Sequence, residues 1–253
     1  MSDGSNVMAS PSRTKFSEQF FAVDRRMWDI VSKGDVNMMI SYLVMACGSV
    51  QNRTTEWSVN AIEKYTRISR GRARDAVERL KECHIIHVER GGRKPLYSIV
   101  CDNFVDEPEW IWLPNAIVTG AANETPAIEL LRQSQNQDAL RLFVNLYGAQ
   151  NLLEEYGVPR AQLWQKFQKH KMGEHGAFIA IGFENDKLHA SPGPLSAPYL
   201  TGKLERRSDG VEQDEGWKRF FAALEPISLT GLAHFVAHVV DGASDLAEVA
   251  HPL

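Results

Sequence analysis

One stretch of the chain decides the fold: residues 57–100, which read WSVNAIEKYTRISRGRARDAVERLKECHIIHVERGGRKPLYSIV. The stretch opens with a predicted short helix, because Ser58 is a favoured N-cap residue and apolar side chains follow at helical spacing. The inward residues of this helix are Val59, Ile62 and Tyr65. The helix is expected to end near Thr66, and Arg67-Ile68-Ser69 then predicts a tight turn with a buried Ile68.

A longer helix and a β-hairpin follow this turn. Ser69 is a suitable N-cap, and apolar residues at helical spacing predict a helix from Arg70 to Cys83. Its inward residues are Ala73, Ala76, Val77 and Leu80. Two β-rich runs come next, and the glycine pair between them predicts a hairpin. The runs are Ile85–Glu89 and Leu96–Val100, and the glycine pair is Gly91-Gly92.

Another helix is predicted upstream, over residues 36–46. Asp35 can cap its N-terminus, and Gly48 follows its end. Apolar side chains recur at intervals of three and four, so they form one stripe along the helix. The residues of this stripe are Val36, Met39, Ile40, Leu43, Val44 and Cys47.

The order helix, short helix, turn, longer helix and hairpin over residues 37–100 resembles the winged helix-turn-helix superfamily. Four local features carry the resemblance: the start of the second helix, the Ile68-Ser69-Arg70 turn, the Leu80-Lys81-Glu82 ending, and the Gly91-Gly92-Arg93 wing tip. The resemblance implies a mainly α fold with small β-hairpins, of the α+β class. It also implies binding to double-stranded DNA.

The resemblance further implies which residues contact the DNA. The leading end of the helix at 70–83 would enter the major groove, where the planar fork of an arginine can contact O6 and N7 of guanine together. The wing would reach the backbone or minor groove, and flanking cations would hold phosphates without reading sequence. The implied residues are Ser69, Arg70, Arg72 and Arg74 on the helix, Arg90, Arg93 and Lys94 on the wing, and Lys64 and Arg67 on the flanks.

The same helix also supports a different interpretation. The residues opposite its apolar stripe are Gly71, Asp75, Glu78 and Glu82, so acids lie on the face that would approach phosphates. In this second interpretation the helix is a solvated surface. It is then stabilised by Arg74–Glu78 and Asp75–Arg79 pairs at i,i+4 spacing, each worth a few tenths of a kcal/mol.

The charge of the chain is unevenly distributed. The net charge is −4, yet residues 53–102 hold 11 Lys and Arg against 7 Asp and Glu. Residues 103–253 hold 12 Lys and Arg against 20 Asp and Glu. Because affinity for phosphates depends on Lys and Arg, the basic stretch favours DNA binding and the acidic half does not.

The second half resembles a diverged copy of the first. A strongly apolar helix is predicted from Gln137, a second helix over about 160–169, a third from Gly216 to near Leu224, and a strand over 233–240. This order again reads helix, helix, helix, strand, which predicts a tandem winged-helix architecture. The predicted organisation is a disordered segment 1–14, a DNA-binding domain 15–102, a linker 103–136, and a second, acidic domain 137–253 for dimerisation or partner binding.

No motif in the chain predicts catalysis, a metal or a cofactor. There is no phosphate-binding glycine loop, nucleophile elbow or dinucleotide fingerprint. His234 and His238 stand four residues apart, but Phe235 occupies the place of the glutamate in a zinc-protease motif, and the neighbouring valines favour strand packing. We therefore expect no catalytic residues, no metal and no cofactor, and the chain is predicted not to be an enzyme.

Apolar runs and cysteines indicate the cellular compartment. No apolar run approaches the ~18 residues of a membrane span, so we expect no membrane partner. The three cysteines, Cys47, Cys83 and Cys101, are far apart and lie in apolar surroundings. This pattern predicts buried thiols in a reducing cytoplasm.

Three functions are consistent with these patterns. The first is a cytoplasmic transcriptional regulator that binds double-stranded DNA as a homodimer, joined through its second half or its first long helix. The second is a plasmid- or phage-type replication initiator, because such proteins resemble two winged-helix domains in tandem. The third is a protein-interaction module that keeps the winged-helix shape without binding DNA, which the acids of the 70–83 helix favour.

Overall fold

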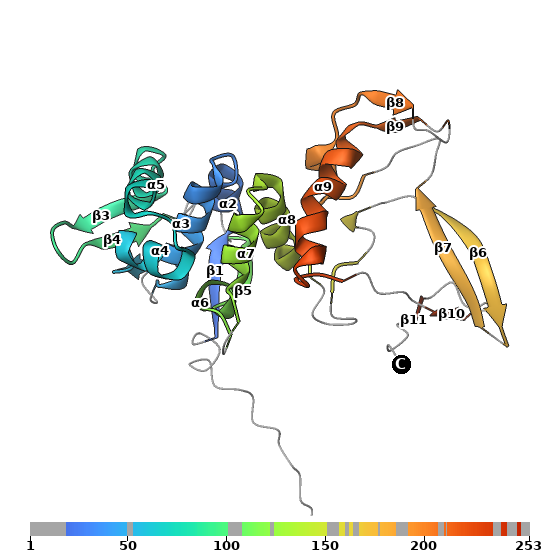
Figure 1. Cartoon of the computed structure of the whole chain (residues 1–253), viewed down its shortest axis with the longest axis horizontal. Coiled ribbons are helices and arrows are strands. Elements are labelled where there is room, and N and C mark those ends of the chain that lie inside the picture. The colour runs from blue at the N-terminus through green and yellow to red at the C-terminus, as the bar shows by residue number, and fades with distance from the viewer. Residues whose placement is uncertain are drawn as a thin grey trace, which may run out of the picture. The chain divides into compact units, whose positions relative to one another are not determined.

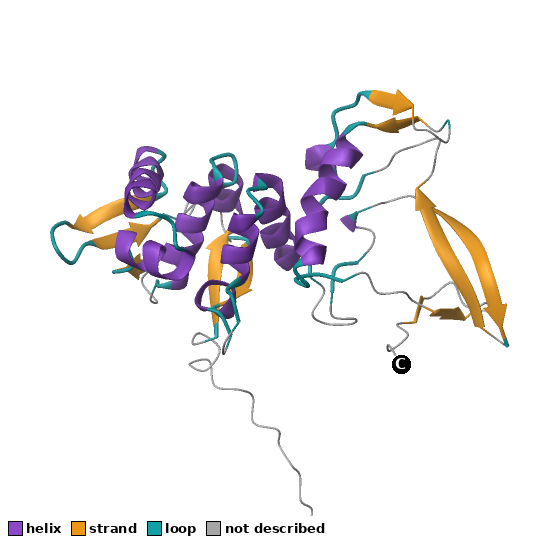
Figure 2. Cartoon of the chain, viewed as in Figure 1, coloured by secondary structure: helices purple, strands orange, loops and turns teal. Residues whose placement is uncertain are grey.

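The computed structural model divides the chain into two units, residues 1–133 and 134–253 (Figure 1). Each unit combines helices with small antiparallel sheets (Figure 2), which confirms the predicted α+β class. The predicted disordered segment 1–14 lies outside the described residues. The structure describes residues 19–49, 53–100, 108–121, 124–150, 157–159, 162–163, 167–176, 178–185, 192–206, 210, 212–234, 239–241 and 247–248.

Helix α3 (Val36–Cys47) forms the centre of unit 1. It begins as predicted, with the Asp35 carboxylate accepting a hydrogen bond of 2.9 Å from the backbone N–H of Met38. Every residue from Met38 to Ala46 is buried, so the helix is covered all round and not only along the predicted stripe. An apolar helix of this kind must be packed by neighbours on every side.

Two helices that cover α3 are α4 (Val59–Thr66) and α5 (Arg70–Glu82). All four inward residues predicted for α5 are buried, which confirms its orientation. On α4 the prediction is confirmed only for Ile62, which is fully buried. Val59 and Tyr65, at the two ends of this short helix, are half-buried.

A buried threonine shapes the turn between α4 and α5. The Thr66 hydroxyl donates to the backbone carbonyl of Ile62 (2.6 Å) and accepts from the backbone N–H of Ile68 (3.2 Å). The second bond gives an acceptor to the buried N–H of Ile68, which lies beyond the end of α4. Arg67 then takes a left-handed conformation with φ of 55°, which directs the chain into α5, and Ile68 is buried as predicted.

The predicted hairpin forms from strands β3 (Ile86–Arg90) and β4 (Leu96–Ile99), which pair antiparallel with Ile86 opposite Ile99. The register shifts between Val88 and Arg90. Strand β2 (Thr54–Thr55) adds to β4, which gives the strand order β2-β4-β3. Gly92 at the tip has φ of 95°, a conformation that favours glycine.

The prediction of a linker over residues 103–136 is wrong for most of its described part. Strand β5 (Trp110–Pro114) pairs antiparallel with β1 (Phe20–Asp24), and its Ile111 and Leu113 are fully buried. Two helices follow, α6 (Ala116–Thr119) and α7 (Ala127–Gln133), and both pack against α3 and α4. Helix α2 (Arg25–Val31) also packs against α3. Chain on both sides of residues 53–100 therefore completes the core around α3.

Unit 2 is built on two helices, α8 (Gln137–Gly148) and α9 (Gly216–Leu229), which pack against each other. Strands β8 (Leu204–Arg206) and β9 (Glu212–Asp214) form a small hairpin before α9. A separate sheet has the order β11-β10-β7-β6. Its members are β6 (Phe167–His175), β7 (Phe178–Asn185), β10 (Val239–Asp241) and β11 (Ala247–Glu248), and the short 3₁₀ helix η2 (Ala197–Tyr199) lies between β7 and β8 in the chain.

Within its described residues, unit 2 does not follow the predicted order of a second copy. The helix predicted over 160–169 is replaced from Phe167 by strand β6, which pairs antiparallel with β7. Helix α9 begins at Gly216 as predicted but continues past Leu224 to Leu229, although Pro226 lies inside it. The strand predicted over 233–240 is observed only from Val239, and residues 235–238 lie outside the described residues.

Polar contacts hold the helices of unit 2 together. Arg219 of α9 binds Asp138 of α8 through two hydrogen bonds, of 2.5 and 2.7 Å. The Asp214 carboxylate accepts from the backbone N–H groups of Thr201, Gly202 and Gly216, at 3.0, 2.6 and 2.7 Å. The Asp214 bonds fix the β8–β9 hairpin and residues 201–202 at the start of α9.

We predict that Thr66→Val destabilises unit 1 by about 1–3 kcal/mol, because valine keeps the shape of threonine but leaves the buried N–H of Ile68 without its acceptor. The midpoint of urea unfolding, followed by circular dichroism, measures the change. The matched control is Gly71→Ala in exposed α5, where an added Cβ would meet no atom within 4 Å. That control should be stabilising by about 0.5–1 kcal/mol. Equal stability of Thr66→Val and the wild type would contradict the role of the hydroxyl.

Candidate nucleic-acid interface

The leading half of α5 carries two exposed arginines that have no partner among the described residues, Arg72 and Arg74. Neither i,i+4 ion pair of the solvated-helix interpretation closes to salt-bridge distance, because Glu78 and Arg79 bind other side chains, although the charge of Asp75 still acts on Arg79. Glu78 takes Lys81, with a distance of 2.7 Å, and Arg79 takes Asp35 of the α3 N-terminus. Two guanidinium groups therefore remain available on this part of the helix.

The Asp35–Arg79 pair has a structural role. It joins the start of α3 to the later half of α5. Burial raises the pKa of Asp35, but the hydrogen bonds from Arg79 and from the backbone of Met38 outweigh it, so the pKa lies below the usual value. The carboxylate is therefore charged at neutral pH, and it engages the Arg79 guanidinium in an ion pair.

Arg70 and Ser69 lie at the very start of α5. The Arg70 guanidinium donates to the side-chain oxygen of Asn60 (2.8 Å) and lies 3.6 Å from the Glu63 carboxylate, so it ties α5 to α4. Ser69 is exposed, and its hydroxyl forms no capping hydrogen bond to α5. Of the two predicted contact residues, Ser69 is open to a ligand and Arg70 is already engaged.

Arg67 was predicted to hold a flanking phosphate, and the structure gives it a structural partner. Its guanidinium lies 3.3 Å from the carboxylate of Glu129 on α7. The Glu129 side chain is only 5% exposed, whereas that of Arg67 is 78% exposed. A buried carboxylate needs a partner that neutralises it, so Arg67 stabilises the contact between the turn and α7.

Of the three cations of the β3–β4 hairpin, one binds groups of the domain itself and two do not. The Arg90 guanidinium donates to the Glu56 carboxylate (3.0 Å) and to the backbone carbonyl of Lys94 (3.1 Å). Arg90 thereby fixes the tip of the hairpin against the segment before α4. Arg93 and Lys94, at the tip itself, are exposed and have no side-chain partner among the described residues.

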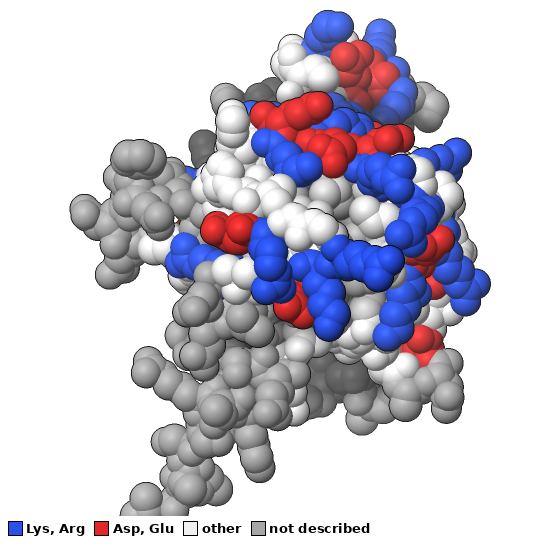
Figure 3. Space-filling model, turned by 90° about the vertical axis from the view of Figure 1, so that its left-hand side faces the viewer, with Lys and Arg blue, Asp and Glu red and all other residues white. Residues whose placement is uncertain are grey.

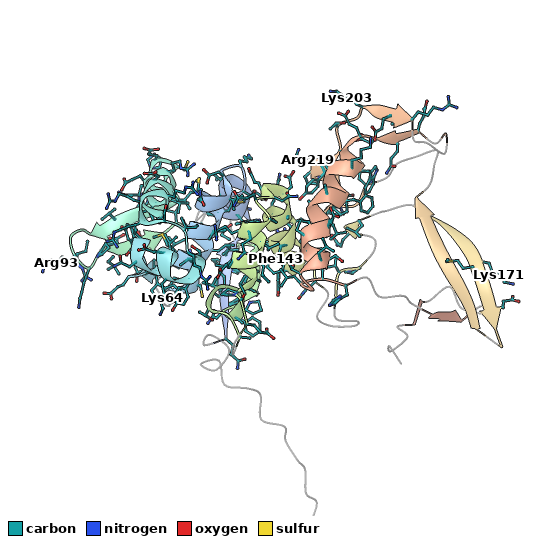
Figure 4. The ribbon with its side chains drawn as sticks, in the orientation of Figure 1. Lys64, Arg93, Phe143, Lys171, Lys203 and Arg219 are labelled. Atoms are coloured by element: carbon teal, nitrogen blue, oxygen red, sulfur yellow. The ribbon has the colours of Figure 1, made fainter. Side chains whose placement is uncertain are left out.

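A surface groove of about 380 Å³ lies between α4 and the hairpin tip, and we call it the α4–hairpin groove. Arg93 stands at the hairpin end and Lys64 on α4 (Figure 4). The full lining is Glu56, Trp57, Ser58, Asn60, Ala61, Lys64, Tyr65, Arg93, Lys94 and Pro95. The sequence analysis did not predict this groove, because its two sides, at Lys64 and Arg93, lie about 30 residues apart in the chain. The aromatic residues at the two ends of α4, Trp57 and Tyr65, were the signal that could have indicated it.

Acidic side chains remain on the same face of unit 1. Figure 3 shows Lys and Arg side chains gathered there with Asp and Glu among them. Asp75 and Glu82 are exposed on α5, as predicted, and Glu78 is exposed but bound to Lys81. The surface is therefore basic at the leading end of α5 and at the hairpin tip, and mixed along the rest of the helix.

Other predicted features have mixed outcomes. Cys83 is exposed, so its predicted burial is wrong, because it lies at the C-cap of α5 and not on the inward stripe. Cys47 is partly buried, and burial raises the pKa of its thiol to about 12. Cys101 and His238 lie outside the described residues. Within the described ranges, no group of three or more His, Cys, Asp or Glu could hold a metal ion. None of the described helices is long and apolar enough to cross a membrane.

Comparisons of the chain with models of protein families, with curated proteins and with solved structures find no match. A function for this chain is therefore inferred from its own residues. The relevant features are the exposed cations of α5 and the hairpin tip, the ion pairs that hold their neighbours, and the α4–hairpin groove between them.

We predict that Arg67→Ala destabilises unit 1 by about 1–3 kcal/mol, because it leaves the buried Glu129 carboxylate without its cation. Arg72→Ala, on an exposed arginine without a partner among the described residues, is the matched control and should change stability by less than about 0.5 kcal/mol. Adding Glu129→Gln to Arg67→Ala should restore part of the stability, since the buried charge is then absent. Equal urea midpoints for Arg67→Ala and Arg72→Ala would show that the pair contributes nothing.

Proposed function

We propose that unit 1 is a winged helix-turn-helix domain that binds double-stranded DNA. In this proposal α5 is the recognition helix in the major groove, and the β3–β4 hairpin is the wing on the backbone or minor groove. The observation that carries the proposal is the pair Arg72 and Arg74, exposed on the leading half of α5 without a partner among the described residues. Arginine side chains in this position suit the acceptors of guanine.

The surrounding contacts support the same division of roles. Arg93 and Lys94 on the wing and Lys64 on α4 would bind phosphates, which position the domain without reading sequence. Arg70, Arg90 and Arg67 are held by acids or amides of the domain itself. We assign these three arginines the role of positioning α5 and the wing. Replacing one of them should therefore weaken DNA binding by displacing α5 or the wing, and not by removing a contact with DNA.

We further propose a regulatory role, in which the protein binds an inverted repeat as a homodimer. A twofold arrangement would place two recognition helices about one turn of DNA apart, so that each reads one half-site. The alternative of a replication initiator rested on a tandem copy in the second half. Because the described elements of unit 2 follow a different order, that alternative has lost its main support.

The interaction module without DNA binding remains a second candidate, and a specific observation favours it. Asp75 and Glu82 are exposed on α5, and phosphates would repel them. If α5 approaches DNA, Asp75→Ala should strengthen non-specific binding, because it removes this repulsion. If the module binds only proteins, Asp75→Ala should leave retention on DNA unchanged at about 100 mM salt.

We predict that Arg72→Ala and Arg74→Ala each weaken binding to the preferred duplex by about 1–3 kcal/mol if they contact guanine, and relax the preference at one base pair. Selection from a random duplex library followed by fluorescence anisotropy measures both effects. Lys81→Ala is the matched control, because Lys81 lies on the same helix but is paired with Glu78 at its far end. A decrease in affinity as large for Lys81→Ala as for Arg72→Ala would argue against the proposed orientation of α5.

A different effect is expected for the wing. Replacing Arg93 and Lys94 together by alanine should weaken binding to all duplex sequences alike, because phosphate contacts carry no sequence information. The slope of log K against log salt should flatten by about 0.9 for each phosphate that the variant no longer neutralises. A change in sequence preference with an unaltered slope would place these residues on base edges instead.

A further inference from the structure

We propose that the α4–hairpin groove binds one unpaired nucleotide of a nucleic-acid strand that continues from the duplex on α5. The inference rests on the proposed function and adds a second class of ligand to it. The groove joins an aromatic pair to three cations, and this is the combination with which proteins hold single strands: a ring for the base and positive charge for the backbone.

The aromatic pair supplies a rigid surface. The rings of Trp57 and Tyr65 stack with centroids 4.8 Å apart and an angle of 22° between their planes. Trp57 lies directly on Gly48, where an added Cβ would come within 2.2 Å of the indole, so the pair is backed by the chain after α3. Neither aromatic is fully buried, and both line the groove.

The Lys64 ammonium lies beside the hydroxyl end of the Tyr65 ring. It lies 4.6 Å from the centre of the tyrosine ring and 3.3 Å from the hydroxyl oxygen. The Lys64 side chain is exposed and has several rotatable bonds, so its ammonium can move from the ring to a phosphate of the incoming strand. That movement would widen the space beside the ring and bring a positive charge to a phosphate of the strand.

The charge of the groove fits a phosphate. Arg93 and Lys94 line the side opposite Lys64, and neither has a side-chain partner among the described residues. The acid of the lining, Glu56, is neutralised by Arg90 at 3.0 Å. The groove therefore offers three cations to an anion, and its volume of about 380 Å³ lies at the lower end of sites for small organic ligands.

The experiment compares one duplex in two forms, blunt and with a short single-stranded tail that carries 2-aminopurine at its first unpaired position. We expect the full chain to bind the tailed form about tenfold more tightly, with fluorescence of the base quenched by stacking. Tyr65→Leu should abolish the preference and the quenching but keep binding to the blunt duplex. Tyr65→Phe, which keeps the ring, should retain both.

Two further variants make the result independent of the tyrosine. Lys64→Ala changes an exposed side chain that the proposed function also places on a duplex phosphate. It should therefore weaken binding of both forms, and that of the tailed form more, without unfolding the domain, which circular dichroism checks. Arg72→Ala should weaken both forms equally, because it acts on the duplex. Equal affinity of the wild type for blunt and tailed duplex, or quenching that persists in Tyr65→Leu, would overturn the inference and leave the proposed function standing.

A separate arm distinguishes failure of the two proposals. The tail strand alone is titrated as a single-stranded oligonucleotide. Binding and quenching of this oligonucleotide without binding of the blunt duplex would overturn the proposed function and keep the groove. Binding of neither the oligonucleotide nor either duplex would overturn both.

Discussion

Burial of α3 is the constraint on which the rest of unit 1 depends. Nine consecutive residues of this helix, from Met38 to Ala46, are buried, so no side of it can face water. Helices α4 and α5 cover it from one direction, and β1, α6 and α7 complete the shell. The orientation of α5, and with it the exposure of Arg72 and Arg74, follows from which of its faces is needed to cover α3.

Ion pairs determine which basic side chains remain available. Unit 1 contains several surface arginines, but Arg67, Arg79 and Arg90 each bind an acid supplied by another element. The more exposed pairs, those of Arg79 and Arg90, contribute little to stability individually, whereas each of the three pairs removes a cation from the surface that a ligand would meet. Among the described residues of α5 and the hairpin, the cations left without a partner lie at the leading end of the helix and at the hairpin tip. This distribution, and not the net charge of −4, bears on the partner.

Unit 2 shows how far element order can mislead. A strongly apolar α8 and an aromatic α9 were recognisable, because each has a clear helical period. The segment between them contains strands whose pairing depends on distant chain, as in the contact of β7 with β10. Local periodicity does not indicate pairings between strands that are far apart in the chain. The sequence analysis therefore predicted a copy of unit 1, whereas the described elements form another arrangement.

The sequence by itself determined the elements of residues 36–100: the Asp35 cap of α3, the inward face of α5, the tight turn and the hairpin all follow from local spacing and residue type, although Ser58 and Ser69 form no side-chain capping bond. Tertiary structure decided the rest. Residues 110–133 were predicted to be a linker, because their own sequence pattern does not show that they fold. They form β5, α6 and α7 because the apolar surface of α3 must be buried by neighbouring elements. The pairing of Arg67 with Glu129, and the meeting of Lys64 with Arg93 across a groove, join residues far apart in the chain. Such contacts depend on how the packed helices place their side chains in space, which the spacing of residues along one helix does not specify.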